Sequence, residues 1–129
     1  MDKPRKSMEE VIRTDGRYPP EAYAFLHEGL RRAVREVYGE KTAIGQKHVS
    51  GQQICRAMRD LAIELWGMLA RTVLAKWNVN ATIDFGNMVY LLIEHDYFRK
   101  DEADSIEDFR DVYDFDEALN VVEEFEIKE

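Results

Sequence analysis

Residues 50–77, SGQQICRAMRDLAIELWGMLARTVLAKW, decide the fold. Apolar side chains recur here every three or four residues, the spacing that places them on one face of an α-helix. They are Ile54, Met58, Leu61, Ala62, Leu65, Leu69, Val73 and Trp77. Ser50 and Gln53 have the spacing of a capping box, which marks the start of a helix. Gly67 interrupts the pattern and costs about 1 kcal/mol relative to alanine inside a helix, so we expect a kink or a break near Trp66-Gly67.

Two helices are predicted before this stretch. Ser7 and Glu10 form a second capping box, which predicts a short helix that ends near Asp15-Gly16. Pro19-Pro20-Glu21 predicts the start of the next helix, because proline and an early carboxylate both suit the first helical turn. Gly39 ends that helix. Its inward face is expected to carry Tyr23, Leu26, Leu30, Ala33, Val34 and Val37.

The remaining third of the chain is also predicted to be helical. Thr82 is expected to cap a helix that ends near His95, and Ser105 with Asp108 to cap a single turn. Asp114 is expected to cap a last helix that has Ala118, Leu119, Val122 and Phe125 on one side. Since no stretch shows the alternation of a strand with an evident partner, we predict an all-α fold. It is a single compact domain over residues 1–129, a bundle of five to seven helices that ends in an acidic C-terminal helix.

The charge of the chain is unevenly distributed. Residues 94–129 carry fifteen acidic and four basic side chains, whereas residues 1–93 carry eleven acidic and fourteen basic ones. Because apolar faces remain within the acidic segment, we expect it to dock on the body of the protein. The expected docking surface is the basic side of the body, formed by Arg31, Arg32, Arg35, Arg56 and Arg59.

Composition excludes several classes of protein. A chain of 129 residues with 45% hydrophobic content can bury a core, and no run approaches the roughly 20 apolar residues that span a bilayer. The single cysteine, Cys55, has no internal partner for a disulfide and is predicted to be a buried, unreactive thiol. These features predict a cytoplasmic protein with no membrane association.

No motif assigns a catalytic activity. His27, His48 and His95 are not paired at the three- or four-residue spacing of helical zinc ligands, and the acidic loop lacks the glycine of an EF-hand. We therefore expect no metal and no cofactor. His48 precedes a helix start, where free backbone N–H groups can hold an anion. Alternatively, it packs beside Val49 at the beginning of that helix.

Several short segments resemble a known family when they are taken together. These segments are Gly16-Arg17-Tyr18, Glu21-Ala22-Tyr23-Ala24-Phe25-Leu26, His48-Val49-Ser50-Gly51-Gln52, Thr82-Ile83-Asp84-Phe85-Gly86, Asp108-Phe109 and Tyr113-Asp114-Phe115. Their order and spacing resemble an uncharacterised bacterial family, a conserved hypothetical repeat protein of planctomycetes and verrucomicrobia. The resemblance implies a small bacterial domain without an assigned activity, although this chain shows no internal repeat.

The sequence favours a noncatalytic interaction or adaptor protein with an unknown protein partner, which could include a second copy of the chain. A nucleic-acid- or phosphate-binding module is the first alternative, but the helix predicted over residues 82–96 contains no Lys or Arg. A small hydrolase that uses His48 is the second alternative. It requires His48 and a carboxylate to meet in one concave pocket. The candidate partner- or anion-binding residues are Arg31, Arg32, Arg35 and His48.

Overall fold

The central stretch of the sequence folds as two helices that separate at Gly67. The computed structural model describes residues 6–39 and 48–121, and in it α3 (Gly51–Trp66) is followed by the 3-10 turn η1 (Gly67–Leu69) and by α4 (Ala70–Lys76). The Ser50 hydroxyl accepts a hydrogen bond from the Gln53 N–H, and the Gln53 side chain accepts one from the Ser50 N–H. Gly67 has φ +53°, a conformation that glycine adopts without steric cost. The predicted capping box and the predicted break are therefore both confirmed.

The other helices begin and end near the predicted residues. They are α1 (Met8–Asp15), α2 (Pro20–Tyr38), α5 (Thr82–Glu94), the 3-10 turn η2 (Ile106–Phe109) and the single turn α6 (Phe115–Ala118). The Ser7 side chain accepts from the Glu10 N–H, and Gly16 ends α1 with φ +72°. Residues 6–39 and 48–121 contain no strand, so the all-α prediction is confirmed.

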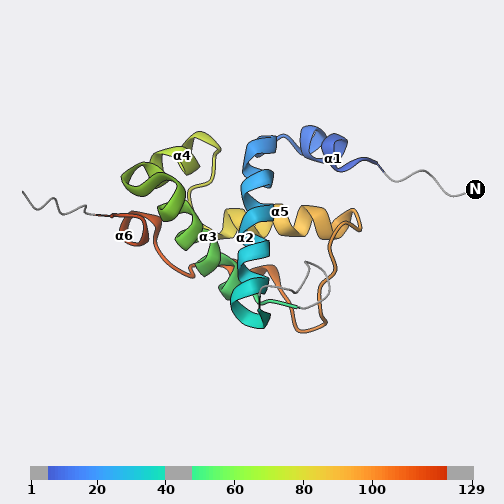
Figure 1. The fold of residues 1–129 in the computed structure, drawn as a ribbon. Coiled ribbons are helices and arrows are strands. Elements are labelled where there is room, and N and C mark those ends of the chain that lie inside the picture. Colours follow the sequence, from blue (N-terminus) through green and yellow to red (C-terminus); the bar gives the residue numbers. More distant parts are fainter. Residues whose placement is uncertain (1–5, 40–47, 122–129) are drawn as a thin grey trace, which may run out of the picture.

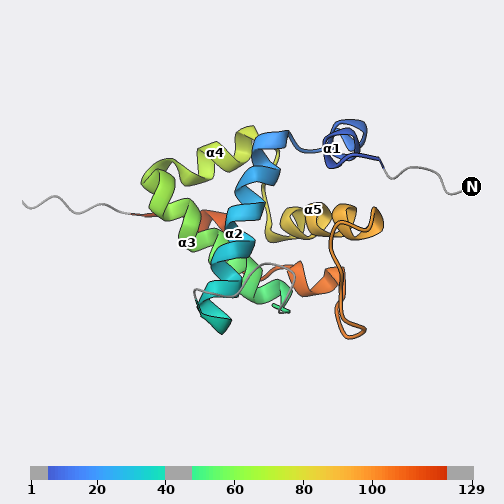
Figure 2. The same cartoon turned by 45° about the vertical axis from the view of Figure 1, so that its right-hand side comes forward.

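The long helices cross one another around a shared core. Figures 1 and 2 show α2 crossing α5 steeply, with α3 beside α2 and α4 turned away at the far end of α3. α2 and α3 approach closely at Gly29, because a Cβ there would lie 1.8 Å from the Met58 sulfur. The largest fully buried side chains come from α2, α3, α4, α5 and the segment before α5. They are Leu26, Cys55, Met58, Leu74, Val79, Thr82, Phe85 and Met88.

The acidic segment docks through Phe109. This ring lies between two helices, where a Cβ at Gly51 of α3 or at Gly86 of α5 would come within 3.0 Å of Phe109 atoms. Phe109 is itself only 3% exposed. The two glycines therefore form the groove that accepts this side chain, and η2 lies against both helices.

Thr82 holds the docked segment in place and does not cap α5. The N-cap of α5 is Ala81, and the Asp84 carboxylate accepts from the Asn80 and Ala81 N–H groups. The buried Thr82 hydroxyl donates to the Phe109 carbonyl at 2.6 Å and accepts from the Val112 N–H at 3.2 Å. The prediction of Thr82 as a cap was wrong, because a competing tertiary hydrogen bond uses its hydroxyl.

Arg32 of the predicted basic docking surface does not pair with the acidic segment. Arg32 forms a two-pronged ion pair with Glu64 of α3 and a further pair with Glu36. Arg71 of α4, which is not part of that surface, pairs with the acidic segment and contacts Asp116 at 3.2 Å. An exposed pair of this kind contributes about 0–1 kcal/mol, so apolar burial and the Thr82 hydrogen bonds hold the segment.

Only the beginning of the expected last helix can be described. Phe115 and Leu119 are buried, at 2% and 3% exposure, whereas Val122 and Phe125 lie outside the described residues. The Tyr113 hydroxyl donates to the Cys55 carbonyl at 2.7 Å and adds a further link to α3. Residues 109–119 therefore follow the body of the protein closely.

The break at Gly67 changes which side chains face the core. Leu65, Met68 and Leu69 are 56%, 57% and 63% exposed. Leu65 and Leu69 belong to the predicted apolar face but do not lie in the core; for Leu69, the turn at Gly67 interrupts the helical phase that defines this face. No helix in the described residues is long and apolar enough to cross a membrane.

Candidate functional site

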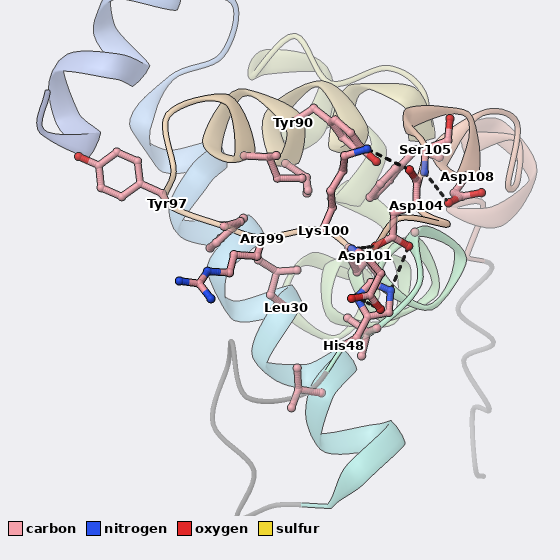
Figure 3. A pocket seen from close by; sticks show the side chains of 18 residues that line it. Leu30, His48, Tyr90, Tyr97, Arg99, Lys100, Asp101, Asp104, Ser105 and Asp108 are labelled. Carbon is pink, nitrogen blue, oxygen red and sulfur yellow. Dashed lines mark hydrogen bonds and ion pairs between the residues drawn. The ribbon is translucent and has the colours of Figure 1, made fainter. Parts of the chain in front are cut away.

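A cleft of about 540 Å³ opens beside His48. Its walls come from α2, the first turn of α3, α5 and the segment 97–109 that follows α5 (Figure 3). The apolar lining consists of Leu30, Val34, Val49, Ile54, Val89, Ile93, Phe98 and Phe109. The polar lining consists of His48, Tyr90, Tyr97, Arg99, Lys100, Asp101, Asp104, Ser105 and Asp108. Ligand sites usually combine apolar lining with converging polar groups, and this cleft contains both.

His48 lies between two carboxylates at one end of this cleft. Its Nε2 is 3.0 Å from Oδ1 of Asp104, and its Nδ1 is 3.6 Å from Oδ2 of Asp101. Figure 3 shows the three side chains turned toward one another. The His48 and Asp101 side chains are 40% and 67% exposed, whereas that of Asp104 is 17% exposed. Solvent or a ligand can therefore reach the histidine from the Asp101 side.

The two carboxylates come from one tight turn. The Asp104 N–H donates to the Asp101 carbonyl at 3.0 Å, and the Asp101 N–H donates to Oδ2 of Asp104 at 2.8 Å. One oxygen of Asp104 thus holds the turn, and the other faces His48. The Lys100 amine reaches back to the Asp104 carbonyl at 3.5 Å.

His48 is held from the opposite side by the end of α2. The Tyr38 hydroxyl donates to the His48 carbonyl at 2.5 Å, and the capped first turn of α3 begins three residues later. Backbone contacts on both sides of His48 fix the position from which its imidazole ring extends. His48 and Asp101 lie far apart in the sequence. The docking of η2 on α3 brings them together.

The cleft is electrically negative near this histidine. Burial raises the pKa of Tyr90, and the negative charges of Asp104 and Asp108 raise that pKa further. Arg99 does not offset these charges at His48, because its guanidinium extends away from the histidine (Figure 3). Such surroundings favour a cation and disfavour an anion.

The structure separates His48 from the other predicted binding residues. Arg31, Arg32 and Arg35 lie on α2, and none of them lines the cleft. Arg31 pairs with Glu28 at 3.5 Å, and Arg32 pairs as described above. The four residues do not form a common site.

The sequence does not indicate the partners of His48. Asp101 and Asp104 belong to the acidic loop that lacks the glycine of an EF-hand, and their three-residue spacing does not indicate a distant histidine. His27 is exposed on α2, and His95 caps the end of α5, which suits the negative end of the helix dipole. Neither of these two histidines lines the cleft.

The cleft meets the geometric requirement stated for a catalytic histidine, but the nearby nucleophiles are engaged elsewhere. The Ser105 hydroxyl accepts from the Glu107 N–H at 3.2 Å and so serves as a helix cap. Cys55 is completely buried, and burial raises the pKa of its thiol to about 12. This confirms the predicted burial of Cys55 and gives the cleft no activated thiol.

Comparison with known proteins adds no relative. No family model, no curated protein and no solved structure matches the chain. The resemblance to the planctomycete and verrucomicrobial family stays a prediction.

Proposed function

We propose that the protein is a noncatalytic binding protein that holds an apolar segment of a partner in the cleft beside His48. The observation that carries this proposal is the cleft of about 540 Å³, whose lining combines apolar side chains from α2, α3 and α5 with polar and charged groups. A shape of this kind binds apolar side chains and uses the polar groups for orientation. The negative rim favours a partner segment in which a basic residue flanks the apolar ones.

Nucleophilic hydrolysis is less well supported than binding. Each ring nitrogen of His48 faces a carboxylate of the protein, so neither nitrogen is directed at open space in the cleft. A general base needs a free nitrogen directed at its substrate. We also propose that the protein is cytoplasmic, since Cys55 is a free thiol and reduced cysteines are typical of that compartment.

A second candidate surface lies at the break between α3 and α4. Leu65, Met68 and Leu69 are the three most exposed large apolar side chains among the described residues. Adjacent exposed apolar residues are typical of protein–protein contacts. This surface would support an adaptor role or self-association without the cleft.

The basic residues of α2 give less support to nucleic-acid binding. The Arg32 guanidinium is already paired with Glu64 and Glu36. Phosphate contacts supply most of the affinity of such proteins, and paired arginines would have to leave their glutamates first. Nucleic-acid binding is therefore less well supported than partner binding at either apolar surface.

Affinity purification with matched variants tests the proposal. The full chain, Ile93→Asp in the cleft and Leu69→Ser at the break would be used as baits in lysate of the native host at low salt, after circular dichroism shows that each is folded. The proposal predicts a partner that Ile93→Asp loses and Leu69→Ser retains. A partner that Leu69→Ser loses and Ile93→Asp retains would assign the function to the second surface. If all three baits recover the same partners, or if none recovers a partner above background, both the cleft and the second surface are contradicted as binding sites.

A further inference from the structure

The side chains around His48 suggest a ligand of a second kind. His48, Asp101 and Asp104 each offer one ligand atom, and these atoms lie within 4.8 Å of one another. The set joins an imidazole from the start of α3 to two carboxylates from the loop after α5 (Figure 3). It differs from a run of surface acids, because a nitrogen donor from a distant part of the chain is brought between the oxygens.

We propose that His48, Asp101 and Asp104 bind a first-row divalent cation such as Zn²⁺ at the mouth of the cleft. Imidazole nitrogen with carboxylate oxygen suits ions of this group, whereas Ca²⁺ and Mg²⁺ prefer oxygen ligands alone. Three protein ligands leave a coordination position open, as in catalytic zinc sites. The inference concerns a different ligand from the partner segment and does not depend on the proposed function.

The distance between His48 and Asp104 requires only a small adjustment for an ion, whereas Asp101 must turn from Nδ1 toward Nε2. Ligand atoms about 2.0–2.1 Å from a tetrahedral zinc lie roughly 3.4 Å from each other. Nε2 of His48 and Oδ1 of Asp104 are 3.0 Å apart, so they would separate by a few tenths of an ångström as the ion replaces the shared proton. Asp101 is 67% exposed, and its side chain is free to turn toward Nε2.

The surroundings support a cation at this point. Oδ2 of Asp104 is fixed by the Asp101 N–H, which orients the other oxygen, as hydrogen bonds to metal ligands commonly do. Asp108 also lines the cleft and adds negative charge. The Lys100 amine is directed to the Asp104 carbonyl oxygen, so the ligand oxygens remain available.

Zinc titration of the full-length protein by calorimetry tests the site. Four single variants would be compared: His48→Gln and Asp104→Asn remove ligands, whereas His27→Gln and Glu102→Gln make the same chemical changes at exposed positions outside the set. We expect one Zn²⁺ per chain, with affinity lowered at least about 10–100-fold by each ligand variant and within about threefold of wild type in each control. Affinity should fall at lower pH, because a ligand histidine must be neutral.

A spectroscopic measurement makes the result independent of variant stability. Co²⁺ added to the unaltered protein should give the visible absorption bands of a four- or five-coordinate site, and Zn²⁺ should shift the ¹⁵N resonances of the His48 ring but not those of His27. Absence of one-to-one zinc binding at 1 mM would overturn the proposal. So would binding that His48→Gln and Asp104→Asn leave unchanged, or ring shifts confined to His27 and His95.

Discussion

Replacing Thr82 by valine should release the acidic segment from the body of the protein. Thr82 is 1% exposed, and its hydroxyl is bonded to the Phe109 carbonyl and the Val112 N–H. Valine keeps the shape of the side chain but leaves both backbone groups without this partner. A buried group left unsatisfied costs about 1–3 kcal/mol. Phe109 is buried and should show the full cost, whereas the half-buried Val112 should show the lower end, which gives a total of about 2–4 kcal/mol.

The matched control is Thr82→Ser, which keeps the hydroxyl and loses one methyl group, at a cost of about 1 kcal/mol. Thr72→Val on the exposed side of α4 should change stability by less than about 0.5 kcal/mol. Urea unfolding measures the free energies, and hydrogen exchange should show a faster Val112 amide in Thr82→Val. If Thr82→Val is as stable as Thr82→Ser within about 0.5 kcal/mol, the hydroxyl does not hold the segment and the reasoning is refuted.

Three further predictions test other contacts. Gly86→Ala should lower the melting temperature, since the new Cβ would lie 2.8 Å from Cβ of Phe109. Overpacking costs about 1–3 kcal/mol and outweighs the gain of about 1 kcal/mol in helix propensity. A higher melting temperature would show that this contact is loose. Tyr18→Phe removes the hydrogen bond to Asp84 at 2.5 Å and should destabilise by about 1.5–3 kcal/mol in urea unfolding at neutral pH. Burial, with Asp84 adding to it, raises the pKa of Tyr18 to about 12. The stabilising contribution of Tyr18 is therefore complete below about pH 10 and is lost as the pH rises toward 12. Equal dependence of stability on alkaline pH for wild type and Tyr18→Phe would contradict this. Cys55, fully buried and with its thiol pKa raised to about 12, should react with a thiol reagent at pH 8 only as fast as the protein opens, whereas a reaction complete within the mixing time would show an exposed thiol.

The sequence predicts the helices well because their signals are local. Ser7 and Ser50 begin helices by accepting from N–H groups three residues ahead, and Gly16 and Gly67 end them with positive φ. These interactions involve neighbours in the chain. A pattern a few residues long therefore contains the information that decides them.

The sequence does not predict which residues of these types make tertiary contacts in place of local ones. Thr82 stands at a helix start and resembles a cap, yet its hydroxyl bonds to Phe109, 27 residues further along the chain. Arg32 likewise belongs to a basic run, but Glu64 on the facing helix neutralises it. Nothing near either residue in the sequence indicates the distant partner.

The site was predicted only in part for the same reason. His48 was identified because it precedes a helix start, but the helix-start argument predicts an anion, and the structure places Asp101 and Asp104 there. Their approach depends on Phe109 entering the groove between Gly51 and Gly86. Small residues on two separate helices form that groove, and it becomes visible only in the folded chain.

Nuclear Overhauser effects between the Phe109 ring and the α-protons of Gly86 and Gly51 would test most directly whether the acidic segment folds back to build the cleft. A Cβ at either glycine would lie about 3 Å from Phe109 atoms, and one α-proton of each glycine points in that direction. The structure predicts strong cross-peaks at both glycines, with their α-protons shifted by the ring. Absence of these cross-peaks, together with random-coil shifts for residues 105–113, would contradict the fold of the segment and remove the cleft.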